Sequence, residues 1–415
     1  MSRVACPQHD LHTRAPAAMP LSPTLQPDWF AHVERVARRT LSVYALSGAR
    51  LAQAIARVSQ LYTRERSALA ELQGDDEALC ARLQFFLSRD LLKIHGPVAE
   101  LARAAAFPER DALRVLDLGA GLGAATLGLS RSLHALGLCE RLSVTAVDID
   151  PDALEVAGEL CADLSSLPGI PVELTTRVHD VRRGWPGAPG DYDVILLGLV
   201  LNELEAGGGA PALAEQLIRL SGLLRDDGVL IIIEPALRET SRALHAVRDV
   251  LAARNAAPYV FAPCLRRALP CPMLQRERDY CHERVPGALP ERLAALARAA
   301  GLRDSDLTYS YLTLHRAPRS LHELRESPTL LRAVSGSLRT KGKIELWLCG
   351  AASAPRGMRL DRHESPANAA FEHAERGCVL DIEPGPSGDD PRLRIAADTR
   401  VELLQSWHQG EVAER

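Results

Sequence analysis

Residues 114–123 read RVLDLGAGLG, a short apolar run that leads into three glycines at alternate positions. Such a run is typical of a buried strand, and helical spacing resumes in the segment TLGLSRSLHALG that follows. Glycine lacks a Cβ, so a turn built from Gly119, Gly121 and Gly123 can bend sharply and let its backbone touch a ligand. Nicotinamide dinucleotide sites use a similar turn, so the glycines alone leave the ligand open.

Three carboxylates accompany this turn. Asp117 comes just before the glycines, Asp148 ends the next predicted strand in SVTAVDID, and Asp180 ends the third in VELTTRVHD. A carboxylate at Asp148 can accept hydrogen bonds from both hydroxyls of a ribose, and Asp180 can meet an adenine amino group. Capping of strand ends explains either residue taken singly. A dinucleotide site would prefer the spacing GxGxxG, whereas Ala124 stands at its last position.

Predicted strands and helices alternate from Leu113 to Ala236. The runs VILLGLVL and VLIIIE are almost continuously apolar, which is typical of strands covered on both faces of a mostly parallel α/β sheet. This segment resembles the class I methyltransferase family. The resemblance implies a Rossmann-like domain that binds S-adenosylmethionine in the crevice at the carboxyl ends of its strands.

Further regions flank this predicted domain. The plan we expect is a disordered tail at 1–27, an N-terminal helical region at 28–108, the S-adenosylmethionine-binding Rossmann-like domain at 109–257, a cysteine-rich loop and basic segment at 258–345, and a small β domain at 346–415. The sequence has neither a run of about 18 apolar residues nor the apolar core of a secretory signal. We therefore expect a cytoplasmic, monomeric protein with no membrane partner.

The end of the fourth predicted strand is where a methyltransferase normally reveals its substrate. It carries neither an Asp/Asn-Pro-Pro-aromatic tetrapeptide, which would hold the amino group of a base, nor a Pro-Cys pair that could attack a pyrimidine ring. Asn202 and Glu203 lie there and are candidates for a catalytic role. Capping of the following helix explains them equally well, so the sequence leaves methyl transfer open.

Four cysteines form a second candidate site. Three of them, Cys264, Cys271 and Cys281, fall within eighteen residues, and Cys349 follows much later at the end of KIELWLC. Four thiolates can hold zinc or an iron–sulfur cluster. The spacings match neither a zinc ribbon nor a ferredoxin run, so scattered buried thiols remain an alternative.

The motifs CPM, DYCH, TYSYL and RTKGKIELWLC follow the methyltransferase-like segment in this order. This order resembles the small-ribosomal-subunit methyltransferase-like family of mitochondria and bacteria, from about Ala81 to Cys349. The resemblance implies an assembly factor that binds the RNA of the immature small ribosomal subunit and carries a 4Fe-4S cluster on the four cysteines named above. The chain departs from the family in having Leu265 after the first cysteine, and Tyr280 and Glu283 around Cys-His. His282 is a possible substitute ligand.

The segment 316–343 carries seven Arg or Lys against two acids, in a chain whose net charge is −4. A local excess of positive charge can neutralise RNA phosphates, although a solvated helix face has the same pattern. The candidates for RNA binding are Arg316, Arg319, Arg339, Lys341 and Lys343.

Three functions stay open on the sequence. The first is a ribosome-assembly protein that binds S-adenosylmethionine, carries the iron–sulfur cluster and is not assured of catalysis. The second is an active RNA or small-molecule methyltransferase with structural zinc, and the third is a non-enzymatic RNA-binding scaffold. Three measurements distinguish these functions: the content of bound iron and sulfide, the turnover of labelled S-adenosylmethionine, and the binding of that cofactor.

Overall fold

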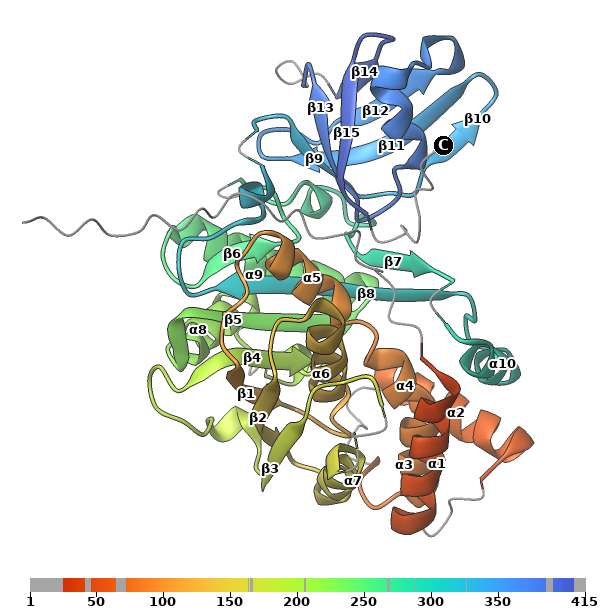
Figure 1. Ribbon diagram of the computed structural model, residues 1–415, viewed down its shortest axis with the longest axis vertical. Helices are drawn as coiled ribbons and strands as arrows, with labels where there is room; N and C mark the ends of the chain where they lie inside the picture. Colours follow the sequence, from red (N-terminus) through yellow and green to blue (C-terminus); the bar gives the residue numbers. More distant parts are fainter. Residues whose placement is uncertain are drawn as a thin grey trace, which may run out of the picture.

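The computed structural model describes residues 25–41, 46–64, 72–162, 164, 167–204, 207–266, 269–287, 289–325, 327–385 and 391–406. Two β-sheets organise this part of the chain, and the smaller domain sits at one end of the larger (Figure 1). Residues 1–24 of the tail expected at 1–27 lie outside the described residues. None of the described helices has the length and apolar content needed to cross a bilayer.

The first sheet has eight strands within the described residues, in the order β3-β2-β1-β4-β5-β8-β6, with β7 paired to β8. The pairs among β1 to β5 are parallel, and β8 runs antiparallel to its three neighbours. The predicted α/β class with a mostly parallel sheet is confirmed. Its strands are β1 (Ala112–Leu118), β2 (Arg141–Asp148), β3 (Val172–Val178), β4 (Tyr192–Gly198), β5 (Leu224–Pro235), β6 (Tyr259–Ala262), β7 (Glu283–Pro286) and β8 (Asp306–His315).

Helices cover both faces of this sheet. Successive residues of β4 show why its sequence is apolar throughout, because Val194 and Leu196 belong to one buried cluster and Ile195 and Leu197 to the other. The cluster on the first face includes residues of α6 and α7, and the cluster on the second face includes residues of α8 and α9. The helices are α6 (Ala124–Leu136), α7 (Pro151–Ala162), α8 (Gly209–Ser221), α9 (Arg238–Arg254) and, before β8, α10 (Glu291–Ala299).

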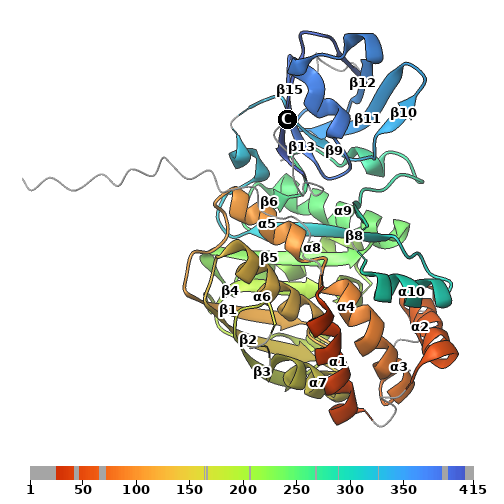
Figure 2. The same cartoon turned by 45° about the vertical axis from the view of Figure 1, so that its right-hand side comes forward.

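The N-terminal helices pack outside α6 and α7 (Figure 2). Two buried polar contacts fasten α1: Trp29 Nε1 donates to Ser88 Oγ at 2.9 Å, and the His32 ring lies 3.0 Å from the Leu160 carbonyl. A π-helical turn, η2, interrupts the helical path between α3 and α4. The elements are α1 (Pro27–Thr40), α2 (Gly48–Thr63), α3 (Asp76–Ala81), η2 (Arg82–Phe86), α4 (Leu87–Asp90) and α5 (His95–Arg103).

The second sheet has seven strands within the described residues, in the order β14-β12-β11-β9-β13-β15, with β10 paired to β11. It includes β9 and β10 from the segment that we expected to precede the small β domain. Phe371, from the 3₁₀ helix η8 (Pro366–His373), is fully buried in its core. The strands are β9 (Leu330–Ala333), β10 (Leu338–Thr340), β11 (Lys343–Gly350), β12 (Arg356–Leu360), β13 (Val379–Glu383), β14 (Arg392–Ile395) and β15 (Arg400–Gln405).

Candidate functional site

The glycine turn joins β1 to α6 at the carboxyl edge of the first sheet. Gly119, Gly121 and Gly123 have φ angles of +67°, +50° and +77°, in the left-handed region that disfavours side chains. Gly119 also needs space, because a Cβ there would lie 2.5 Å from the Val200 Cγ2 atom just after β4. The turn therefore brings backbone close to both neighbouring strand ends.

Asp148, at the end of β2, lies directly against this turn. Its Oδ2 accepts the Gly121 backbone N–H at 2.7 Å, and its Oδ1 accepts the Asp150 N–H at 2.9 Å. Burial raises the pKa of this carboxyl, while the two backbone N–H groups and Arg82 oppose the rise. The structure thus brings together the glycine turn and the carboxylate that the sequence predicts to hold a ribose.

Asp117 lies beneath the turn and has no exposed surface. The Thr126 hydroxyl in α6 donates to Asp117 Oδ2 at 2.7 Å, so the carboxyl ties the end of β1 to the following helix. Burial raises its pKa to about 7. These contacts indicate that Asp117 stabilises the conformation of the glycine turn.

Asp180 lies two residues after the end of β3, the strand adjacent to β2. Its carboxylate accepts hydrogen bonds from Arg182 Nε and Nη2, both at 2.8 Å, and from the Arg182 backbone N–H at 3.0 Å. These contacts cap the 3₁₀ turn η3 (Val181–Arg183) and lower the pKa of Asp180 to about 2. The side chain predicted to meet adenine is thus engaged by Arg182.

An arginine from the N-terminal region reaches the same edge and was missed by sequence reasoning. Arg82, in η2, pairs with Asp150 at 2.6 Å, and their side chains are only 12% and 8% exposed. Its Nη2 would lie 3.4 Å from a Cβ placed on Gly121. π-helical turns often occur at functional sites. Asp150 is the second aspartate of AVDID, so its place at the end of a predicted strand could have identified it as a site residue. No sequence pattern identified Arg82.

The catalytic candidates Asn202 and Glu203 fall in the 3₁₀ turn η4 (Leu201–Leu204), which follows β4. The backbone of this turn is fixed by Glu234 of β5, whose Oε1 accepts the Leu201 N–H at 2.9 Å. Lys93 is buried nearby and pairs with Asp90 at 2.6 Å. Burial lowers the pKa of Lys93, and the Asp90 and Glu234 carboxylates oppose that change.

The four cysteines gather where the two domains meet. Cys264 follows β6, Cys271 precedes the 3₁₀ turn η5 (Pro272–Leu274), Cys281 precedes β7, and Cys349 lies in β11. Burial raises the pKa of every one of these thiols, to about 12 for Cys271 and Cys349. The charge of Cys264 raises the pKa values of the other three, an influence that requires proximity.

Two arginines lie against these thiols. The Arg248 guanidinium, from α9, lowers the pKa of Cys264, and Arg266 lowers that of Cys349. Among the described residues, no group of three or more His, Cys, Asp or Glu side chains is arranged to hold a metal ion. His282, the possible substitute ligand, stacks on Tyr280 with a ring separation of 4.9 Å.

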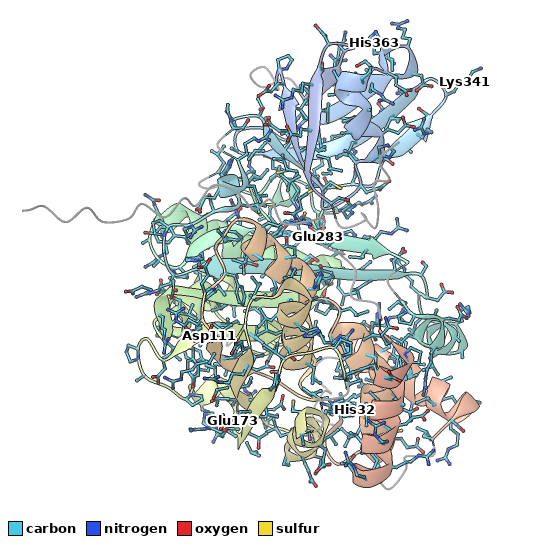
Figure 3. All side chains as sticks on the ribbon, in the orientation of Figure 1. His32, Asp111, Glu173, Glu283, Lys341 and His363 are labelled. Carbon is cyan, nitrogen blue, oxygen red and sulfur yellow. The ribbon has the colours of Figure 1, made fainter. Side chains whose placement is uncertain are left out.

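A buried ionic cluster lies beside the cysteines and was also missed. Arg332 of β9 donates to Glu100 Oε1 at 2.6 Å, to Glu283 Oε1 at 2.9 Å and to Tyr311 Oη at 3.1 Å. Gln405 of β15 donates to Glu100 Oε1 at 2.5 Å. The cluster joins α5, both sheets and the last described strand, and Figure 3 labels Glu283 at this junction.

The basic segment is dispersed by the fold. Arg332, which contributes to its charge excess, is buried, and Arg319 donates to the Ala104 and Ala105 carbonyls near α5. Arg339, Lys341 and Lys343 lie instead on the β10–β11 hairpin, where Lys341 marks the outer tip in Figure 3. Arg339 pairs with Glu372, and Lys343 pairs with Glu345 at 3.1 Å. Arg316, just after β8, is half-buried. The five candidates do not form one patch.

Comparison with protein families identifies the chain. The family model described as "Mitochondrial small ribosomal subunit Rsm22" matches residues 98–358, which is more than half of the sequence. The chain belongs to the Rsm22 family. The match runs from α5 to β12, so it includes the glycine turn and all four cysteines. The predicted membership of a small-ribosomal-subunit methyltransferase-like family is confirmed.

Two curated relatives of this Rsm22-family chain are ribosomal protein L11 methyltransferases. The protein from Geotalea uraniireducens is 38% identical over 94 residues, which cover 23% of this chain and 25% of the relative. The protein from Geobacter sulfurreducens is 38% identical over 109 residues, 26% of each chain. The chain thus spans about a quarter of the length of these relatives.

Solved structures similar to the Rsm22-family chain include the YcgJ protein from Bacillus subtilis. It is 13% identical with a TM-score of 0.30, and the match covers 53% of this chain and 98% of YcgJ. Precorrin-6y C5,15-methyltransferase from Geobacter metallireducens is 14% identical with a TM-score of 0.30, and the match covers 52% of this chain and 87% of that enzyme.

Proposed function

We propose that this Rsm22-family protein binds S-adenosylmethionine, carries a 4Fe-4S cluster and binds or modifies small-subunit ribosomal RNA during ribosome assembly. The observation that carries the proposal is the gathering of four thiols, one buried and three half-buried, beside a methyltransferase-like domain. A cytoplasmic, monomeric protein is part of the same proposal.

The carboxyl edge of the first sheet supports cofactor binding. The glycine turn has the backbone freedom to approach the ligand, and the contact between Asp148 and the turn supports the proposed role of this carboxylate in accepting ribose hydroxyls. When bound, S-adenosylmethionine supplies a methyl group that a nucleophile can attack. Arg82 and Asp150 bring the N-terminal helices to this edge, where they would help to exclude water.

The cysteine set fits a cluster by its chemistry. Four thiols come from segments of both domains, and burial raises their pKa values even though nearby arginines oppose the rise at Cys264, Cys281 and Cys349. Iron would favour the thiolate forms, and an assembly of four thiolates and a cluster carries net negative charge. Arg248 and Arg266 lie where they would stabilise that charge. Cluster binding would thus contribute folding energy at the junction.

Anaerobic purification tests the cluster directly. We expect a brown protein with bound iron and acid-labile sulfide, and we expect Cys271→Ser to lose both. Cys139→Ser is the matched control, because this thiol contacts the Asp111 and Arg141 carbonyls away from the junction. Stoichiometric zinc without iron would contradict the cluster and favour the zinc-bearing alternative.

Calorimetry tests the cofactor edge. We expect wild-type protein to bind S-adenosylmethionine, and we expect Asp148→Ala to weaken binding at least tenfold because the ribose loses a charge-assisted partner, which is worth about 1.5–3 kcal/mol. Glu155→Ala on the exposed face of α7 is the control. Lack of binding by the wild type would favour the RNA-binding scaffold. Transfer of labelled methyl groups to ribosomal RNA, lost in Asn202→Ala, would establish catalysis.

A further inference from the structure

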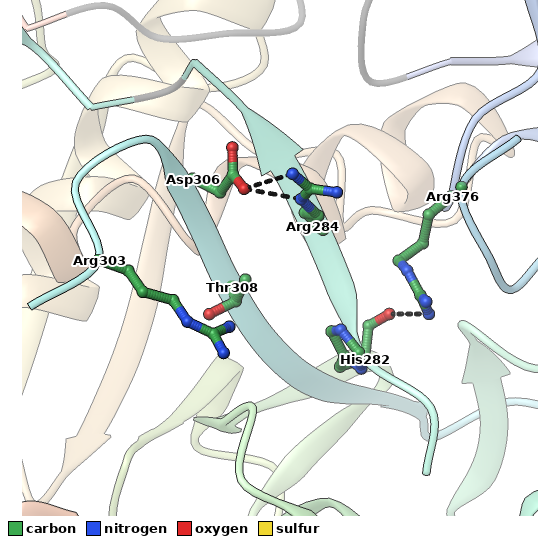
Figure 4. Close-up of a pocket in the computed structure, with 7 residues that line it drawn as sticks. His282, Arg284, Arg303, Asp306, Thr308 and Arg376 are labelled. Carbon is green, nitrogen blue, oxygen red and sulfur yellow. Dashed lines mark hydrogen bonds and ion pairs between the residues drawn. The ribbon is translucent and has the colours of Figure 1, made fainter. Parts of the chain in front are cut away.

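A cavity of about 420 Å³ opens between β7, β8 and the domain built on the second sheet, called the second domain below (Figure 4). The first domain is the one built on the first sheet. Its volume is in the range of small-ligand sites. It lies apart from the glycine turn and outside the basic segment 316–343, apart from Gly336. Its lining residues are His282, Arg284, Arg303, Asp306, Thr308, Gly336 and Arg376.

The lining is cationic. Asp306 is the acid in it, and Arg284 neutralises this group through contacts of 2.7 Å. Arg303 and Arg376 therefore leave two positive charges in excess. In the part of the chain that the structure describes, Arg303 makes no ion pair. Arg376 donates through Nη1 to the His282 carbonyl at 3.2 Å, which anchors its guanidinium at the cavity.

Hydrogen-bonding capacity is also unused at this cavity. The Nδ1 atom of His282 is buried and has no hydrogen-bond partner within the described residues. A buried polar atom of this kind usually has a partner, which is often a water molecule or a ligand. The Thr308 hydroxyl adds a further donor to the lining.

We propose that this cavity binds a phosphate group of the RNA backbone. The inference rests on the RNA binding proposed above and assigns one of its contacts. Guanidinium groups match phosphate oxygens in geometry and charge. Two guanidinium groups in a concave site should therefore bind a phosphate more tightly than a single arginine on an open surface does. The volume leaves room for the adjoining sugar as well.

The position of the cavity explains how one phosphate would engage both domains. Arg303 and Arg284 come from the first domain, whereas Arg376 and Gly336 come from the second. A bound phosphate would therefore draw opposite walls together by charge. His282 lies one residue from Cys281, so the site adjoins the cysteine junction.

Fluorescence anisotropy with full-length protein and a short labelled oligouridylate tests the proposal. We expect Arg303→Gln and Arg376→Gln each to weaken binding several-fold at moderate salt. Each should also reduce the slope of log affinity against log salt by about 0.7, the value for one phosphate contact on a single strand. Arg141→Gln removes an exposed arginine at the start of β2 and is the charge-matched control.

Three other outcomes would overturn the proposal. Pocket variants that match Arg141→Gln in affinity and salt slope would exclude an RNA phosphate here, while leaving RNA binding by the wild type intact. Wild-type protein that fails to bind RNA would remove this proposal together with the RNA-binding function. Heat of orthophosphate binding that disappears in both variants while RNA binding is unchanged would identify a free phosphate as the occupant.

Discussion

Replacement of Arg332 by methionine gives a sharp test of the junction between the domains. The side chains of Arg332, Glu100 and Glu283 are 3%, 0% and 3% exposed, so their charges are shielded from water. Removal of one partner from a buried pair costs about 3–5 kcal/mol, because the remaining charge has no compensation. Since whole domains are stable by about 5–15 kcal/mol, we expect Arg332→Met to lose roughly a fifth or more of the free energy of unfolding.

This loss should depend on pH with a definite sign. Burial raises the pKa of Glu283, and Arg332 opposes the rise. Without the guanidinium, the folded-state pKa should rise further above the unfolded value. Folded protein then binds more protons than unfolded protein, so the stability of Arg332→Met should fall as pH rises above about 4.3, the ordinary glutamate pKa.

Urea denaturation followed by circular dichroism measures both effects. Arg394→Met, an exposed position on β14, is the control for losing an arginine from the second sheet. A triple variant that also carries Glu100→Gln and Glu283→Gln should recover much of the loss, because no buried charge is then left unpaired. The reasoning is refuted if Arg332→Met costs less than about 1 kcal/mol or matches the control at every pH.

Three further predictions concern the cofactor edge. Gly119→Ala should lower the free energy of unfolding by about 1–3 kcal/mol and abolish cofactor binding, because φ at this position is positive and the new Cβ would collide with Val200. Urea denaturation and calorimetry measure the two effects, and an unchanged stability and affinity would contradict the close approach of the turn to Val200. Asp117 has a pKa raised to about 7, so wild-type stability should fall by up to about 1.4 kcal/mol per pH unit between pH 4 and 7, and Asp117→Asn should flatten that slope in denaturation series. Arg82→Met should leave Asp150 uncompensated and increase proteolysis of the N-terminal helices, whereas Arg38→Met on α1 should not.

Local patterns were sufficient to predict the first five strands. The apolar runs, the glycine turn and the position of Asp148 all follow from residues close in sequence, and parallel pairing then brings β1 and β2 together. The placement of β8 between β5 and β6 was not predictable in this way. It depends on pairings between segments that are far apart in the chain.

Charge patterns were less informative than apolar ones. Arg332 lies in a basic segment and has the local context of a surface residue, yet its partner Glu100 is 232 residues away. Arg82 likewise owes its place at the cofactor edge to an ion pair with Asp150, which lies 68 residues further along the chain. Sequence spacing carries no record of such partners, so the ionic cluster at the junction and the arginine at the cofactor edge required the structure.

The run Cys281-His282-Glu283-Arg284 explains why three features share one junction. Side chains alternate between opposite faces of an extended segment. Cys281 and Glu283 accordingly join the thiols and the buried ionic cluster, whereas His282 and Arg284 line the cationic cavity. β7 is held at its edge by pairing with β8 alone within the described residues. A shift of this segment by one residue would exchange the two faces, placing Glu283 in the cavity and Arg284 in the core. The contacts of the thiols, of Arg332 and of a bound phosphate therefore all favour a single register of this short strand.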